Sequence, residues 1–489
     1  MALLFVNKLS PAQIIIKDTL QPAFKWQLPL IDLTFTVDAA SAEANRRTGR
    51  DAQSSEKAEF RDFSHAYRNL SMEQNTEMTR NLHGSLYYGH NLLWQKWMAP
   101  TNTKKYVMNR LFANITALAT DYLAIKLPYG YAFQHEEFHR SVMAVHGIYS
   151  YDEVWKFEKG FDIAVTGVMD QDLVFLKDKF PASQVRLSAA GVEGEYAFFQ
   201  RMRKDNFFDQ TGYPMVGLNI LGTVHAINYV KLPFQSKFNA ITDSILSRDK
   251  TDILARDFTG YDFSAWVYDL FTPDDPYAAR GEWPGGTGIR RPIKETDLTP
   301  EMKTFLRQTA NLQYLNLVSP FMIGINRIKI HHNTFGNFAL RSTPTSFGYF
   351  AGGDFFLETN GKKFFATAGI NKSRELTLPD LSIQRIDMSI QNCPRLTVDA
   401  GLSVWLQPKD QLFFAKKAVP GMSLFLKPSY RISPSAALTA KVSYKTKGWE
   451  FANPYLNEKL MGSISLNIYS KGWESRKSTK PPNISDVPF

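Results

Sequence analysis

Cysteine is almost absent from this sequence, because Cys393 is the only one among 489 residues. A single thiol excludes a disulfide within the chain, and it also excludes a zinc site built from several cysteines. The chain also lacks an uninterrupted apolar run of about 20 residues, the length that a membrane-spanning helix needs. With only one cysteine present, histidine and the carboxylates are the ligand types that remain for a metal site.

Clusters of basic residues are absent too. Lys and Arg outnumber Asp and Glu by 57 to 47, which gives a net charge of +10, but these residues are scattered along the chain. No nucleic-acid-binding motif accompanies them, so we expect no nucleic-acid partner. The length exceeds what one ordinary core supports and predicts two structural units.

The N-terminal segment 1–38 contains two features of interest. Its start, "MALLFVNKLSPAQ", resembles the end of a secretory signal whose basic beginning is missing, and an ordinary N-terminal segment is the equal alternative. Further along, residues 30–37 ("LIDLTFTV") alternate apolar and polar side chains. We interpret them as a first β-strand.

From Phe321 onward the chain divides into runs of about ten residues in which apolar and polar residues alternate, such as "RLTVDAGLSVWLQ" and "MSLFLKPSYRIS". Neighbouring side chains of a strand point to opposite faces, so each run has one apolar and one polar face. The polar faces carry Asp399, Lys427 and Lys441 in mid-strand, which suits a water-filled interior. Tight turns alternate with long, aromatic-rich loops. A soluble antiparallel sheet is the alternative.

Strands of this length, with short turns on one side and long loops on the other, resemble bacterial outer-membrane β-barrels. The resemblance implies an α+β protein: an antiparallel transmembrane β-barrel of about 8–12 strands, with a large helical domain inserted after the first strand. Because a barrel in lipid leaves no edge unpaired, we expect 30–37 to pair with 461–469. It further implies the outer membrane of a double-membrane bacterium as location, and outer-membrane lipid as a partner. The expected segments are 1–38, 39–318 (helical), 319–470 (barrel) and 471–489 (tail).

The helical segment contains the most specific motif of the chain, "QHEEFHR" at 134–140. The surrounding apolar residues are spaced helically and the segment ends in glycine, which predicts a helix over about 132–145. His135 and His139 lie one turn apart on that helix, so both imidazoles can reach one zinc ion. Glu136 then lies beside the metal's open position, where it can act as the general base on a water molecule.

This motif is the HExxH signature of zinc metallopeptidases, and a third ligand defines the subfamily. In metzincins a third histidine follows closely, but His146 lies roughly 10 Å along the helix axis from His139, too far for the same ion. Gluzincins use a glutamate from a later helix, and "VRLSAAGVEGEYAFFQRM" offers Glu193 and Glu195. Glu195 falls among the apolar residues of that helix, where a lone carboxylate is costly unless it is paired or binds a metal. The chain therefore resembles gluzincins, with Glu195 as the expected third ligand and Glu193 as the fallback.

These features predict a zinc-dependent, endopeptidase-like outer-membrane protein. Glu136 is the expected catalytic residue, His135, His139 and Glu195 the expected zinc ligands, and a protein or peptide of the cell envelope the expected substrate. Other outer-membrane proteins are further candidate partners. A non-enzymatic barrel subunit of an outer-membrane assembly or transport complex, with a vestigial or structural metal site, is the alternative. A soluble metalloenzyme with a β-rich C-terminal domain is a third.

Overall fold

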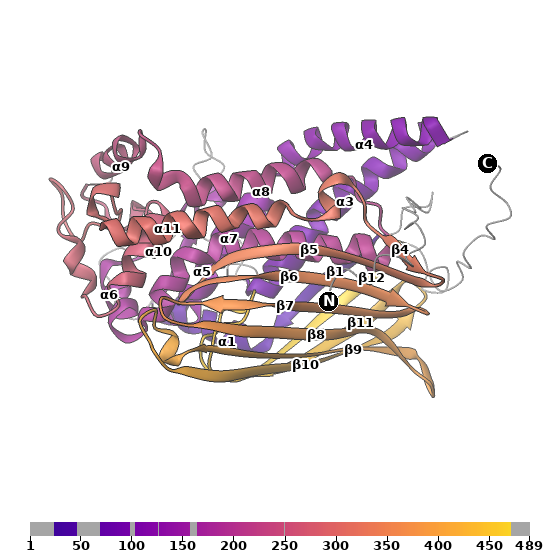
Figure 1. Cartoon of the computed structure of the whole chain (residues 1–489). Helices are drawn as coiled ribbons and strands as arrows, with labels where there is room; N and C mark the ends of the chain where they lie inside the picture. Colours follow the sequence, from indigo (N-terminus) through magenta and orange to yellow (C-terminus); the bar gives the residue numbers. More distant parts are fainter. Residues whose placement is uncertain are drawn as a thin grey trace, which may run out of the picture.

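A layer of helices lies against one large antiparallel sheet in the computed structural model of this chain (Figure 1). The structure describes residues 24–45, 69–97, 103–125, 127–156, 164–248 and 250–470. In this part of the chain, no helix combines the length and the hydropathy needed to cross a membrane. The helices are α1 (Leu33–Asn45), α3 (Met72–Trp97), α4 (Thr103–Ala124), α5 (Tyr131–Ala144), α6 (Asp170–Lys179), α7 (Pro181–Lys204), α8 (Val216–Lys231), α9 (Phe238–Ser247), α10 (Asp262–Phe271) and α11 (Pro300–Leu312).

The large sheet has ten strands in the order β1-β12-β11-β10-β9-β8-β7-β6-β5-β4. Every neighbouring pair is antiparallel, and from β4 to β12 each strand pairs with the next one in sequence. A separate two-stranded sheet joins β2 (Tyr151–Asp152) to β3 (Val165–Thr166). The strands of the large sheet are β1 (Lys25–Asp32), β4 (Ile328–His331), β5 (Thr334–Thr345), β6 (Gly348–Thr359), β7 (Lys362–Lys372), β8 (Thr377–Ile390), β9 (Cys393–Pro408), β10 (Ala418–Ser433), β11 (Ala436–Lys445) and β12 (Lys459–Tyr469).

The predicted closed barrel is wrong, because β1 and β4 form the two ends of an open sheet and do not pair with each other. Helices, rather than water, cover the inner face of this sheet. The mid-strand Lys441 pairs with Glu73 of α3 at 2.6 Å, and Asp354 of β6 accepts a hydrogen bond from Gln200 of α7. An alternating strand has one polar face in either arrangement, so the alternation alone did not distinguish them.

The N-terminal strand pairs with the last strand, as expected, but its bounds differ from the prediction. β1 runs antiparallel to β12, with Leu28 opposite Leu466. It ends at Asp32 instead of continuing to Val37, and α1 begins at the next residue. The Asp32 carboxylate accepts a hydrogen bond from the backbone N–H of Phe35 at 3.0 Å. Such a side-chain cap stabilises the start of a helix and competes with continuation of the strand.

The helical segment and the strand segment pack directly against each other. Phe413, in the loop after β9, contacts Phe271 and Phe305 of the helices, with ring centroids 4.8 Å apart in both pairs. At the other end of the sheet, the ring centroids of Phe207 and of Phe356 on β6 lie 5.7 Å apart. α5, α7 and α10 pack together beside this shared core. These three helices position the candidate site.

Candidate metal centre

The HExxH helix forms as predicted and is buried along most of its length. α5 spans Tyr131–Ala144, with Gly130 as its N-cap, and both histidines lie on its buried side. The imidazoles of His135 and His139 have ring centroids 5.0 Å apart. Their one-turn separation on the helix therefore brings both rings to one point, as the motif requires.

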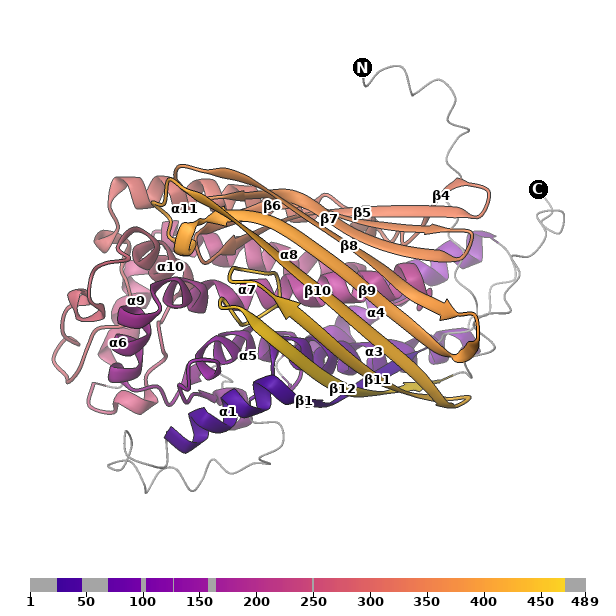
Figure 2. The same ribbon diagram turned by 90° about the horizontal axis from the view of Figure 1, so that it is seen from below.

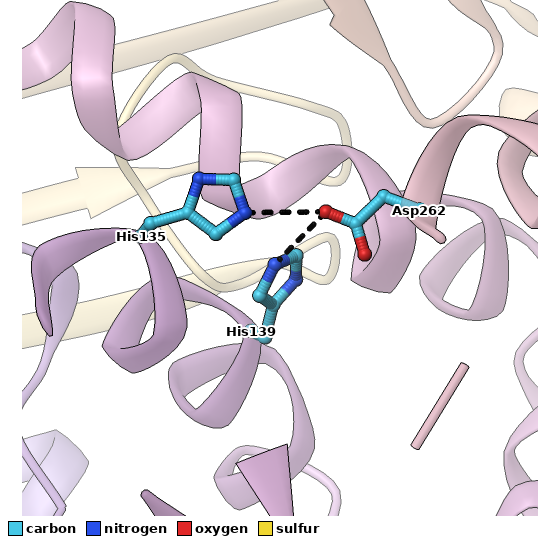
Figure 3. Close-up of side chains that lie close together, drawn as sticks. All are labelled: His135, His139 and Asp262. Carbon is cyan, nitrogen blue, oxygen red and sulfur yellow. Dashed lines mark hydrogen bonds and ion pairs between the residues drawn. The ribbon is translucent and has the colours of Figure 1, made fainter. Parts of the chain in front are cut away.

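Asp262 completes this group from a different helix. It is the first residue of α10, and its Oδ2 atom lies 3.2 Å from Nε2 of His135 and 3.3 Å from Nε2 of His139 (Figure 3). The three candidate ligand atoms all lie within 4.8 Å of one another, and all three residues are buried. This buried group of His135, His139 and Asp262, the metal group, could hold a metal ion.

The other ring nitrogen of each histidine is hydrogen-bonded to an acceptor. Nδ1 of His135 lies 2.8 Å from Oε1 of Glu195, and Nδ1 of His139 lies 2.6 Å from the carbonyl oxygen of Leu187. Because a carboxylate and a carbonyl accept, each Nδ1 carries a proton, and each Nε2 faces Asp262, where its lone pair can bind a metal once any proton on it has left. Metal-binding histidines in proteins usually have such a second hydrogen bond.

Glu195 therefore occupies a different place from the one that the sequence predicted. It lies on α7 against the Nδ1 side of His135, and its Oε2 accepts a hydrogen bond from the Tyr131 hydroxyl at 2.7 Å. It is not among the three residues whose ligand atoms cluster. The fallback, Glu193, has other partners. It forms an ion pair with Arg186 at 2.8 Å and accepts a hydrogen bond from the backbone N–H of Ala452 at 2.6 Å.

Gly191 of α7 leaves the space in which the two imidazoles meet. A Cβ built on this glycine would collide with Nε2 of both His135 and His139. No residue with a side chain fits there without displacing the rings, so the close approach of α7 to α5 requires glycine at this position. The glycine thus preserves space beside the two nitrogens that would bind a metal.

The acidic residues at the metal group pair with histidines. Within the described residues, no Lys or Arg forms an ion pair with Asp262 or Glu195; their charged partners are the histidines. Burial would raise the pKa of Asp262, but His139 and His135 outweigh it and lower this pKa to about 2. Burial likewise opposes a proton on His135, but Asp262 and Glu195 raise its pKa well above the ordinary value. The site therefore favours a positive charge between its acidic groups, whether a proton or a metal ion.

Glu136 is half-buried on the same helix turn. Burial raises the pKa of its carboxyl well above the ordinary range, and the charges of Asp152, Asp257 and Asp262 add to this effect, while His135 opposes it. Asp257 belongs to the loop before α10, where its side chain accepts the backbone N–H groups of Thr259 and Gly260. Glu136 directly follows His135 on α5, and the charges of His135 and Asp262 both act on its carboxyl.

Sequence reasoning missed Asp262. Its only local signal is an acid at the start of a strongly apolar helix, "DFSAWVYDLF", the same kind of signal that favoured Glu195. Both carboxylates are buried near His135, and spacing along the chain did not show which one faces Nε2. Comparisons with protein-family models, with curated proteins and with solved structures found no match.

Proposed function

We propose that this chain is a zinc-dependent hydrolase that cleaves peptide bonds. The observation that carries the proposal is the convergence of His135 Nε2, His139 Nε2 and Asp262 Oδ2, with Glu136 next to His135 on the same helix. Two imidazoles and one carboxylate form a donor set that zinc uses in catalytic sites, where three protein ligands leave one position for water or substrate. The HExxH motif on α5 supports zinc over other divalent metals.

Each residue has a definite role in this proposal. His135, His139 and Asp262 would hold the zinc, while Glu195 and the Leu187 carbonyl orient the two imidazoles. Zinc in this position supplies Lewis acidity, which polarises a carbonyl and lowers the pKa of water. Glu136 accepts the proton of the attacking water and delivers it to the departing amine. Burial raises the pKa of the Glu136 carboxyl, and this favours its uptake of that proton.

One observation favours a second candidate, a non-enzymatic protein in which the metal stabilises the fold. The side chains of His135, His139 and Asp262 are only 11%, 1% and 3% exposed. Such low exposure suits a metal that stabilises the fold, whereas a catalytic site must admit a substrate. Glu136 distinguishes the two, because a structural site does not need a base beside it.

Substitution of Glu136 tests the choice. Glu136→Gln keeps the size of the side chain but cannot accept a proton at neutral pH, so it should retain zinc and lose at least about 100-fold in peptide hydrolysis. Hydrolysis is measured with a library of quenched fluorescent peptides, and zinc by elemental analysis of the same samples. Glu301→Gln, which changes an exposed carboxylate on α11, is the matched control. Equal hydrolysis by wild type and Glu136→Gln, or none by zinc-loaded wild type, would contradict the peptidase.

A further inference from the structure

The outer face of the sheet is apolar and exposed. Along β10, Met422, Leu424, Leu426, Tyr430 and Ile432 are 38–57% exposed. The residues between them, such as Ser423 and Lys427, point inward and are buried or half-buried. In a water-soluble sheet packed against helices, the apolar face is expected to point inward, toward those helices.

The apolar residues of neighbouring strands lie side by side and make this surface continuous. Leu402 of β9 stands opposite both Leu424 of β10 and Ile383 of β8, and Leu426 stands opposite Val442 of β11. From Met422 to Ile432 the surface extends about 34 Å along the strand, at about 3.4 Å per residue. A tilted strand needs about 9–11 residues to cross the hydrocarbon core of a bilayer, and the apolar stretch of β10 has this length.

The helical layer also exposes apolar side chains, on the side away from the sheet. α7 packs against both α8 and β5, so α8 is separated from the sheet by a layer of helix (Figure 1). Ile220, Leu221 and Val224 of α8 are 37–59% exposed. On α4, the exposed apolar residues are Phe112, Ile115, Tyr122 and Leu123. Between 112 and 125 the single charged residue is Asp121, which is buried and accepts a hydrogen bond from Tyr87.

Charged residues instead pair between the two layers and along the inner face. Lys441 of β11 pairs with Glu73 of α3 at 2.6 Å, and Arg341 of β5 pairs with Asp354 of β6 at 3.4 Å. The side chains of Arg341 and Asp354 are 6% and 1% exposed. Polar groups inside and apolar groups outside, on two opposite sides, are the reverse of the usual polarity of a protein in water.

We infer that these two surfaces form one apolar belt, made of the exposed apolar residues of β8–β11, α4 and α8, which is covered by the acyl chains of a lipid bilayer. A second copy or a protein partner would cover one side and leave the other in water, whereas lipid surrounds both sides at once. Figure 2 shows the sheet side, with β8, β9 and β10 facing the viewer. This inference does not depend on the metal chemistry.

Nitroxide labels test the belt, because the chain has a single natural cysteine. In a Cys393→Ser background, one label each is placed at Leu426→Cys on the sheet, Leu221→Cys on α8 and Glu301→Cys as an exposed polar control. The full chain is reconstituted in phosphatidylcholine vesicles, and spin relaxation by oxygen, which enters acyl chains, is compared with relaxation by a water-soluble nickel chelate. We expect oxygen contact at 426 and 221, at least about five times stronger than nickel contact, and the reverse at 301.

Three outcomes overturn the inference. Strong nickel contact at 426 and 221 places the belt in water. Protection of one side only, varying with protein concentration, identifies a second copy, and one-sided protection without lipid identifies a protein partner. Val442→Cys and Ile220→Cys probe the same two sides, and circular dichroism of every labelled variant confirms that the fold is intact.

Discussion

Two groups of buried carboxylates in this protein differ in what neutralises them. Along the inner face of the sheet, Asp354 pairs with Arg341, and on the sheet side of α7, Glu193 pairs with Arg186. At the metal group, Asp262 and Glu195 have only histidines as charged partners in the described part of the chain. An arginine is a permanent cation, whereas a histidine can exchange its proton for a metal. The arginine-paired carboxylates therefore keep a permanent cation as partner, whereas the carboxylates beside the histidines can take part in binding a metal ion.

Removing a carboxylate from the metal group should have the largest effect. Asp262→Ala deletes one of the three ligand side chains, and we expect zinc affinity to fall by more than about 100-fold, beyond the range for residues that only orient ligands. Competition with a fluorescent chelator measures this affinity. Asp354→Ala serves as the control, because it removes a buried carboxylate of the other group. Equal zinc affinity of wild type and Asp262→Ala would remove Asp262 from the ligand set.

The same Asp354→Ala variant should lose stability instead of metal. It leaves Arg341 buried without its anionic partner and removes the acceptor of Gln200 and Thr367. Loss of one member of a buried ion pair typically costs about 3–5 kcal/mol in the free energy of unfolding. Leu426→Ala, on the outer face of the same sheet, should cost less than about 1 kcal/mol because its side chain is 54% exposed. Denaturant titration compares the two, and similar costs would contradict the assignment of inner and outer faces.

Two glutamates on one helix give a narrower contrast. Glu195→Gln weakens the acceptor that holds Nδ1 of His135, and we expect zinc affinity to fall by about 10–100-fold. Glu193→Gln, two residues away, changes a carboxylate that faces Arg186 and the loop at Ala452 and should leave zinc affinity unchanged. If the two variants bind zinc equally, Glu195 does not support the metal group.

The smallest expected effect is the change in zinc affinity for each pH unit. The pKa of His135 is raised well above its ordinary value, so at neutral pH zinc must displace a proton from this ring, and affinity should fall by about tenfold for each unit of decreasing pH. Asp262, with a pKa of about 2, remains ionised between pH 5 and 8 and contributes no proton there. In Asp262→Ala the hydrogen bond that raises the pKa of His135 is lost, so the decline should begin at a lower pH. Calorimetry in two buffers of different ionisation enthalpy measures the released proton, and no release would contradict the pKa assignment.

Much of the local structure could be predicted because it depends on short periods. The helical spacing around "QHEEFHR" predicted a helix over 132–145, and α5 spans Tyr131–Ala144. The alternation in "MSLFLKPSYRIS" predicted a strand with one apolar and one polar face, and β10 has both. The same method failed at 33–37, where the alternation continues but Asp32 caps α1. The boundary lies where the Asp32 side chain caps the helix, a contact that the alternation does not encode.

The sequence by itself determined the HExxH helix and the strands with their two faces, which follow from the 3.6-residue and 2-residue periods of the backbone. The pairing of the first strand with the last was expected from closure of a barrel, but it occurs in an open sheet whose edges are β1 and β4. Only the tertiary structure decided that helices cover the inner face of an open sheet, that Asp262 faces the histidines, and that Glu195 lies behind His135. Each of these depends on which distant segments meet in space. Carboxylates of equal chemistry, such as Glu193, Glu195 and Asp262, take different roles according to whether an arginine, the Nδ1 or the Nε2 of a histidine lies opposite.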